Sequence, residues 1–133
     1  MADDCIELRD LNFKTFRAEE GGGGETQIDG KSWEEFLQDV LADEFQIVRS
    51  KAGTPQQKQN KAAMIAWITT HPRGGVRIHA QEVVSWCNET MGVVTCPVTL
   101  NDKDYHNIKI FKKQPPGQWQ CVYWQVTQLT PDG

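Results

Sequence analysis

Three stretches in the last third of the chain decide the fold: GVVTCPVTL (92–100), YHNIKIFKK (105–113) and QWQCVYWQVT (118–127). Each is rich in β-branched and aromatic residues, and polar turns separate them, the second of which is QPPG (114–117). Such runs predict an antiparallel meander. The segments before the meander favour helices, so we expect an α+β domain whose sheet curls over the helices and encloses a pocket.

The length and charge of the chain indicate how many domains it forms and which kinds of partner it is expected to bind. Its 133 residues fit a single domain (1–133) that can bury a core without disulfides. The formal net charge is −4, and the lysines and arginines are scattered, so we expect no nucleic-acid partner. Because no apolar run approaches the ~20 residues of a membrane span, we also expect no membrane partner.

The N-terminal segment and the cysteines predict a cytoplasmic protein. The first residues are acidic and lack the basic and apolar regions of an export signal. The four cysteines, Cys5, Cys87, Cys96 and Cys121, contain no Cys-x-x-Cys pair. We therefore expect reduced thiols, with Cys96 and Cys121 buried inside apolar strands.

Three helices are expected ahead of the meander. The first covers residues 4–20 and ends at the four glycines 21–24, which we interpret as a loop. The second begins with the capping box Ser32-Trp33-Glu34-Glu35, followed by apolar residues at helical spacing. The third is expected to begin at Thr54-Pro55 and to end at residues 71–75.

Two further strands are expected, at residues 45–49 and 76–86, the second with a bulge at Gln81-Glu82. In the last strand, Trp119 and Trp124 have opposite parity, which predicts that they face opposite sides of the sheet. We assign one set to the inner face: Val122, Trp124 and Val126. The alternate set is assigned to the outer face: Cys121, Tyr123 and Gln125.

The order of these elements resembles the nuclear transport factor 2-like superfamily, in its SnoaL-like and ketosteroid-isomerase-like branch. The resemblance rests on LADEF (41–45) between a helix and a strand, and on GQW (117–119) and WQVT (124–127) in the last strands. It covers most of the chain from Trp33 to Leu129, and residues 1–31 match poorly. It implies a cystatin-like cone, in which a curved antiparallel sheet wraps about three N-terminal helices, and a homodimer packed through the outer sheet faces.

The resemblance also implies where chemistry would be located. The carboxylate base of ketosteroid-isomerase-like enzymes falls at about Arg49, which cannot act as a base at neutral pH. Arg49 instead suits an anionic ligand, or an ordinary ion pair at a strand end. The oxyanion-hole acid falls at Asn107, whose amide can donate to a ligand carbonyl or serve a purely structural role. Lys109 shares the face of Asn107, and a register slip of one residue would move both side chains to the other face.

The candidate ligand-binding residues are Arg49, Trp67, Asn107, Lys109 and Trp124. No catalytic residue is assigned. His79 and His106 are the histidines on expected strands, and neither has a partner at metal-ligand spacing, so we expect no metal and no other cofactor.

Three functions stay open. The first is a domain that binds a small, largely apolar ligand in the pocket of the cone. The second is a SnoaL-like or ketosteroid-isomerase-like enzyme (an isomerase, cyclase or dehydratase), which needs a carboxylate or histidine inside the cone. The third is a non-catalytic dimerisation module with a filled cone. Binding is preferred because the expected base is missing, and binding needs only an apolar pocket with a few polar groups.

Overall fold

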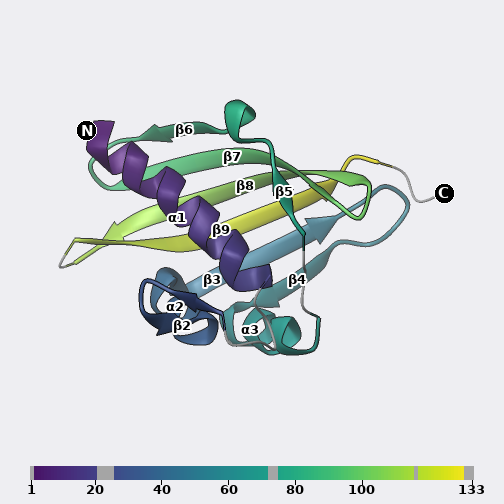
Figure 1. Cartoon of the computed structure of the whole chain (residues 1–133), viewed down its shortest axis with the longest axis horizontal. Coiled ribbons are helices and arrows are strands. Elements are labelled where there is room, and N and C mark those ends of the chain that lie inside the picture. The colour runs from purple at the N-terminus through teal and green to yellow at the C-terminus, as the bar shows by residue number, and fades with distance from the viewer. Residues whose placement is uncertain (1, 21–25, 72–74, 116, 131–133) are drawn as a thin grey trace.

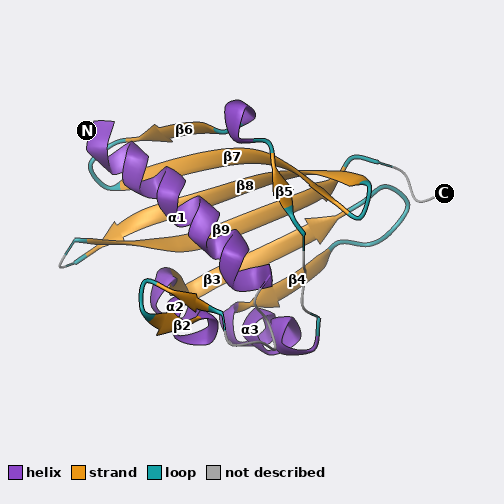
Figure 2. Cartoon of the chain, viewed as in Figure 1, coloured by secondary structure: helices purple, strands orange, loops and turns teal. Residues whose placement is uncertain are grey.

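A computed structural model of the chain describes residues 2–20, 26–71, 75–115 and 117–130. These residues form three α-helices and two sheets (Figures 1 and 2). The helices are α1 (Ala2–Glu20), α2 (Trp33–Val40) and α3 (Lys61–Thr70). The strands are β1 (Gln27–Ile28), β2 (Lys31–Ser32), β3 (Leu41–Ser50), β4 (Gln57–Asn60), β5 (Arg77–Ile78), β6 (Val84–Cys87), β7 (Met91–Leu100), β8 (Lys103–Gln114) and β9 (Gln118–Gln128).

The main sheet has seven strands in the order β4-β3-β9-β8-β7-β5, and β6 also pairs with β7. Strand β3 is parallel to β9, and the other pairs in this sheet are antiparallel. Helix α1 runs obliquely across one face of the sheet, while α2 and α3 lie at the edge formed by β3 and β4 (Figure 1). The predicted α+β architecture, with a curved and mainly antiparallel sheet, is confirmed.

The predicted meander is formed by β7, β8 and β9. Strands β7 and β8 are joined by a two-residue turn, because Leu100 pairs directly with Lys103. The turn residues Asn101 and Asp102 both have positive φ, at 53° and 63°. Asn and Asp tolerate this conformation better than other non-glycine residues, and it is the one that a tight hairpin needs.

A bulge in β9 reverses the facing of its first half. Ile110 of β8 pairs with Tyr123, but the next residue, Phe111, pairs with Cys121, so one residue of β9 stands outside the register. An extra residue shifts the alternation by one position. Trp119, Cys121 and Trp124 are therefore all buried on the inner face. The prediction that the two tryptophans face opposite sides was wrong, as was the placement of Cys121 on the outer face.

The helix cap predicted at Ser32 is confirmed, since the hydroxyl of Ser32 accepts a hydrogen bond from the Glu35 amide at 3.2 Å. The carboxylate of Glu35 returns to the Ser32 hydroxyl, at 3.5 Å, and not to the Ser32 amide that a full capping box uses. The expected start of the third helix was wrong. Helix α3 begins at Lys61, capped by the side chain of Asn60, and the residues before it form β4. Pairing with β4 satisfies the backbone groups at the edge of β3, a long-range requirement that a local pattern does not reveal.

The expected strand over residues 76–86 is interrupted. Strands β5 and β6 both pair with β7, but a 3₁₀ turn at Ala80–Glu82 separates them where a bulge was expected. The expected loop at 21–24 and most of the expected end of the third helix, at 72–74, lie outside the described residues. No helix in the described part of the chain is long and apolar enough to cross a membrane.

The core lies between α1 and the inner face of the sheet. Among its fully buried side chains are Leu8, Phe16, Leu37, Phe45, Ile47, Phe111 and Trp124. Along β7 and β8, buried residues alternate with more exposed ones, as expected for a sheet that has one face covered. Helix α1 packs on this face through apolar residues such as Leu8 and Phe16, with the buried polar residues Asn12 and Thr15 between them.

A disulfide joins α1 to β6. Cys5 and Cys87 are 82 residues apart in sequence, and their Cα atoms are 5.8 Å apart. The expectation of reduced thiols was wrong for this pair, because only the crossing of α1 over the sheet brings the two residues together. Cys96 and Cys121 are free and buried, as predicted.

We predict that removing this disulfide destabilises the fold. Replacing Cys5 and Cys87 by serine should lower the free energy of unfolding by about 3–4 kcal/mol, because the bridge closes a long loop in the unfolded chain. Urea denaturation with and without dithiothreitol measures this. The wild-type protein should lose stability in reductant, and the double variant should not respond. An equal response of both proteins would contradict the prediction.

Candidate functional site

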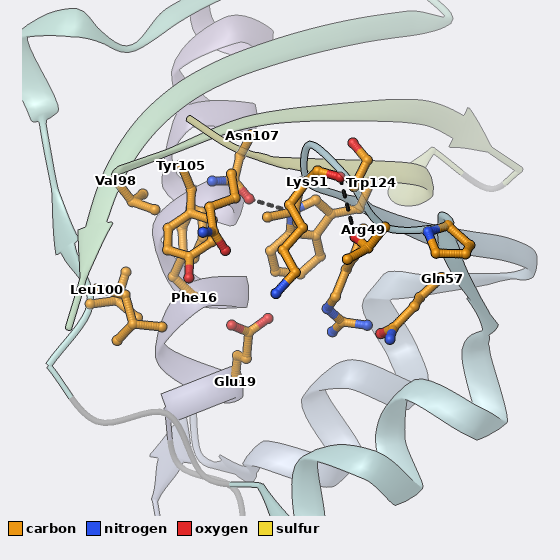
Figure 3. A pocket seen from close by; sticks show the side chains of 16 residues that line it. Phe16, Glu19, Arg49, Lys51, Gln57, Val98, Leu100, Tyr105, Asn107 and Trp124 are labelled. Atoms are coloured by element: carbon orange, nitrogen blue, oxygen red, sulfur yellow. Dashed lines mark hydrogen bonds between the residues drawn. The ribbon is translucent and has the colours of Figure 1, made fainter. Parts of the chain in front are cut away.

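A cavity of about 250 Å³ opens between the end of α1, the end of β3 and the strands β7 to β9 (Figure 3). Its volume is close to the lower end of the range of roughly 300–1,000 Å³ typical of small-ligand sites. The residues that line it are Phe16, Glu19, Arg49, Ser50, Lys51, Thr54, Pro55, Gln57, Val76, Val98, Leu100, Tyr105, Asn107, Trp124, Val126 and Gln128.

The inner part of the cavity is built around Asn107 and Trp124. The indole nitrogen Nε1 of Trp124 donates a hydrogen bond to Oδ1 of Asn107 at 2.7 Å. Since an indole nitrogen can only donate, this bond fixes the orientation of the amide and leaves its NH₂ group on the other side. The nitrogen Nδ2 of Asn107 is buried and has no hydrogen-bond partner. Figure 3 shows it turned away from Trp124.

The walls around this amide are mainly apolar. The ring of Phe16 meets that of Trp124 edge to face, with centroids 5.4 Å apart. Val98, Leu100 and Tyr105 line the wall formed by β7 and β8. In such surroundings an unpaired amide donor is costly, on the order of 1–3 kcal/mol, so the free NH₂ of Asn107 is an unusual feature.

The mouth of the cavity carries its charges. Arg49 at the end of β3 donates a hydrogen bond to Oε1 of Gln59, and its guanidinium lies 4.5 Å from the ring centroid of Trp67. Trp67 in turn stacks on His71, with ring centroids 4.4 Å apart. Figure 3 shows Lys51 pointing toward the carboxylate of Glu19. Glu19 lies near the end of α1 and is only 6% exposed.

Lys109 lies behind the cavity and does not line it. Its ammonium donates to the backbone oxygen of Asn12 at 3.2 Å, to Oδ1 of Asn12 at 2.9 Å and to Oγ1 of Thr15 at 2.6 Å. It also lies 3.6 Å from the ring centroid of Phe16 and 3.9 Å from that of Trp124. The two rings that form the cavity wall thus cover a buried cation.

Burial lowers the pKa of Lys109 to about 7, while its interactions with Cys121, Cys96 and Glu19 act in the opposite direction. Burial is the larger cause because a fully enclosed ammonium loses its hydration. The same effect raises the pKa of Cys121 to about 12 and also raises that of Cys96. Both thiols are therefore neutral at physiological pH and poor nucleophiles.

The five predicted ligand residues divide into two groups. Arg49, Asn107 and Trp124 line the cavity, whereas Trp67 and Lys109 lie behind it and contact residues that do. The facing of Asn107 and Lys109 on the inner side of β8 agrees with the register assumed from the sequence.

Sequence reasoning missed several lining residues, among them Phe16, Glu19, Lys51 and Tyr105. Tyr105 precedes Asn107 by two residues in the same strand, so the alternation of faces was a usable signal for it. Phe16 and Glu19 lie in the segment that matches the family pattern poorly. Nothing in the local sequence places the end of that helix over the cavity.

Solved structures share this fold. A nuclear transport factor 2-like protein from Silicibacter pomeroyi aligns with a TM-score of 0.69 and 11% identity over 96% of this chain and 98% of its own. A nuclear transport factor 2-like protein from Cytophaga hutchinsonii aligns with a TM-score of 0.72 and 14% identity over 93% and 97%. The chain has the nuclear transport factor 2-like fold. The fold expected from the sequence resemblance is thus confirmed.

A candidate ketosteroid isomerase from Parabacteroides distasonis also shares the fold, with a TM-score of 0.59 and 8% identity over 93% of this chain and 89% of its own. No protein-family model and no curated protein matches the chain. Because this fold serves many functions, similarity at such low identity carries the architecture but no activity.

We predict that Lys109 makes stability depend on pH. The folded protein releases the Lys109 proton near pH 7, whereas the unfolded chain keeps it up to the ordinary pKa of 10.5. Between these values the unfolded state binds more protons, so stability rises with pH, by at most about 1.4 kcal/mol per unit. Below pH 7 the amine is charged in both states and the full cost of burying it remains.

The variant Lys109→Met isolates this effect, because ionisable groups common to both proteins largely cancel in the difference. Urea denaturation from pH 6 to pH 9.5 should show the wild-type protein gaining stability relative to the variant above pH 7. Parallel pH profiles for the two proteins would show that Lys109 titrates normally.

Proposed function

We propose that this protein binds a small, largely apolar ligand in the cavity of its cone, with an oxygen of the ligand accepting a hydrogen bond from Asn107. One observation carries the proposal: the buried amide nitrogen of Asn107, which lines the cavity and has no partner in the protein. A ligand oxygen at this point would recover the hydrogen bond that the fold leaves unmade.

Two features support a mainly apolar ligand that carries one hydrogen-bond acceptor. The side chains next to Asn107 are aromatic or aliphatic, and they include Phe16, Val98 and Trp124. The amide is held in one orientation by the indole of Trp124, so the donor is placed before a ligand arrives. A preplaced donor within apolar walls is the usual composition of a small-molecule site.

An enzyme is the second candidate, and Glu19 is the observation that favours it. Its carboxylate is buried and lines the same cavity as Asn107, so a base and a hydrogen-bond donor could act on one carbonyl compound. Exchange of solvent deuterium into 2-octanone next to its carbonyl separates this candidate from simple binding. A dimerisation module without a ligand accounts less well for the unfilled cavity.

We predict that Asn107 discriminates a carbonyl from a hydrocarbon. The wild-type protein should bind 2-octanone about tenfold or more tightly than 2-methyl-1-octene, which has the same shape but no hydrogen-bond acceptor. In Asn107→Leu this ratio should fall to about one. Tryptophan fluorescence titration and ligand-induced thermal shift measure it, and circular dichroism checks that the variant is folded.

Trp124→Phe is the companion variant, because it keeps the amide donor of Asn107 and removes the indole that orients it. This variant should prefer the ketone less strongly than the wild-type protein does, but more strongly than Asn107→Leu. An unchanged ratio in Asn107→Leu would remove Asn107 from the site, and absence of binding by either compound would contradict the proposed function.

We also propose a homodimer through the outer face of the sheet. One row of paired residues on this face is apolar across four strands: Trp86, Val93, Ile110 and Tyr123. Trp86 at the edge of the row is 60% exposed, and Val84 next to it on the same face is 62% exposed. A continuous apolar strip of this kind is typical of surfaces that associate.

We predict that Ile110→Glu produces a monomer, since each protomer would bring a charge into the interface. Sedimentation equilibrium should show a dimer for the wild-type protein and for the control Glu34→Arg, which changes an exposed residue of α2. A monomeric wild-type protein, or a dimeric Ile110→Glu variant, would contradict this mode of association.

The compartment stays a prediction. We propose the cytoplasm, as expected from the sequence, but the Cys5–Cys87 disulfide is more typical of an oxidising environment. Blocking free thiols at the moment of cell lysis, followed by mass spectrometry, distinguishes a bridged protein from a reduced one.

A further inference from the structure

We infer that the ligand is an amphipathic organic acid, with its oxygen acceptor and apolar body inside the cavity and its anionic group at the mouth, beside Arg49 and Lys51. This inference rests on the proposed function, because it describes the same ligand. It adds a charge and an orientation, neither of which follows from the contacts of Asn107.

The charges of the cavity are confined to one end. Among the described lining residues, the ionisable acidic and basic side chains are Glu19, Arg49 and Lys51, and Figure 3 shows their charged groups gathered below Asn107 and Trp124 in the view. The cations outnumber the single carboxylate at this opening, although the whole chain carries a formal charge of −4. The local field therefore favours an anion in a protein that otherwise repels anions.

Arg49 is held in a defined position. Gln59, from the neighbouring strand β4, accepts a hydrogen bond from its guanidinium, and the ring of Trp67 lies beneath it at 4.5 Å. A guanidinium restrained by an aromatic face and an amide loses little entropy on meeting a carboxylate, and its planar fork matches the two carboxylate oxygens. Trp67 thus supports the site from behind without lining it.

The remaining polar groups at the mouth are uncharged. Gln57 and Gln128 line the cavity beside these cations and can donate to an anion without adding charge. Deeper in the cavity, the described lining residues carry no charge that would accept the acidic end of a ligand. The acid must therefore point outward, where its partly hydrated carboxylate costs least to bind.

The experiment compares 7-oxooctanoate with its methyl ester, which has the same ketone and chain but no charge. The acid should bind about tenfold more tightly than the ester in low salt, and the ratio should shrink in 0.5 M NaCl. Isothermal titration calorimetry measures both dissociation constants. Equal affinities would overturn the inference and leave the proposed function intact, whereas absence of binding by both compounds would overturn the two together.

Three variants test the sign of the charge effect. Lys51→Gln and Arg49→Gln should each lower the acid-to-ester ratio severalfold, and Lys51 is exposed, so its replacement carries little risk to folding. Glu19→Gln should raise the ratio, because it removes the negative charge that the described lining residues contribute to the cavity. A purely structural role of these residues would change the affinity for both compounds alike.

Asn107→Leu separates this inference from the proposed function. It should weaken the acid and the ester equally and leave their ratio unchanged, because both compounds carry the ketone. Ratios that stay constant across the Lys51, Arg49 and Glu19 variants would contradict recognition of an anion at the mouth.

Discussion

The ammonium of Lys109 joins α1 to the centre of the sheet. It rises from β8 and donates to three oxygens of Asn12 and Thr15, and the rings of Phe16 and Trp124 lie against it. Because a buried ammonium is tolerable only when its donors are satisfied, the helix cannot slide or rotate without exposing an unpaired charge. This constraint, with the Cys5–Cys87 disulfide at the other end of the helix, places the end of α1 over the sheet.

The cavity is a consequence of that placement. Phe16 follows Thr15 directly and covers Trp124, and Glu19 reaches the opening one turn later. The bulge in β9 shapes the side of the cavity formed by the sheet. It brings Trp119, Cys121 and Trp124 to one face, which gives a continuous buried surface under α1. Helix and sheet thus leave a space that is apolar inside and charged at its opening.

Much of this architecture could be predicted because the signals were local. The meander, the helix cap at Ser32 and the shared facing of Asn107 and Lys109 each follow from turn chemistry or from a two-residue alternation. Of the five candidate residues, Arg49, Asn107 and Trp124 line the cavity, and their role in binding a ligand stays a prediction. The errors arose where one residue or one long-range pairing changes the outcome: the bulge in β9, the edge strand β4 and the disulfide.

The sequence by itself determined the class of fold, the order of its three helices and of the last three strands, and the residue types available to a site, because these depend on periodicity and composition along short segments. The tertiary structure alone decided which side chains share a cavity. Glu19 and Asn107 are far apart in the chain, and they line one space only because α1 crosses the sheet where Lys109 holds it. Contacts between distant segments depend on packing and on satisfied buried charges, and neither leaves a pattern in the local sequence.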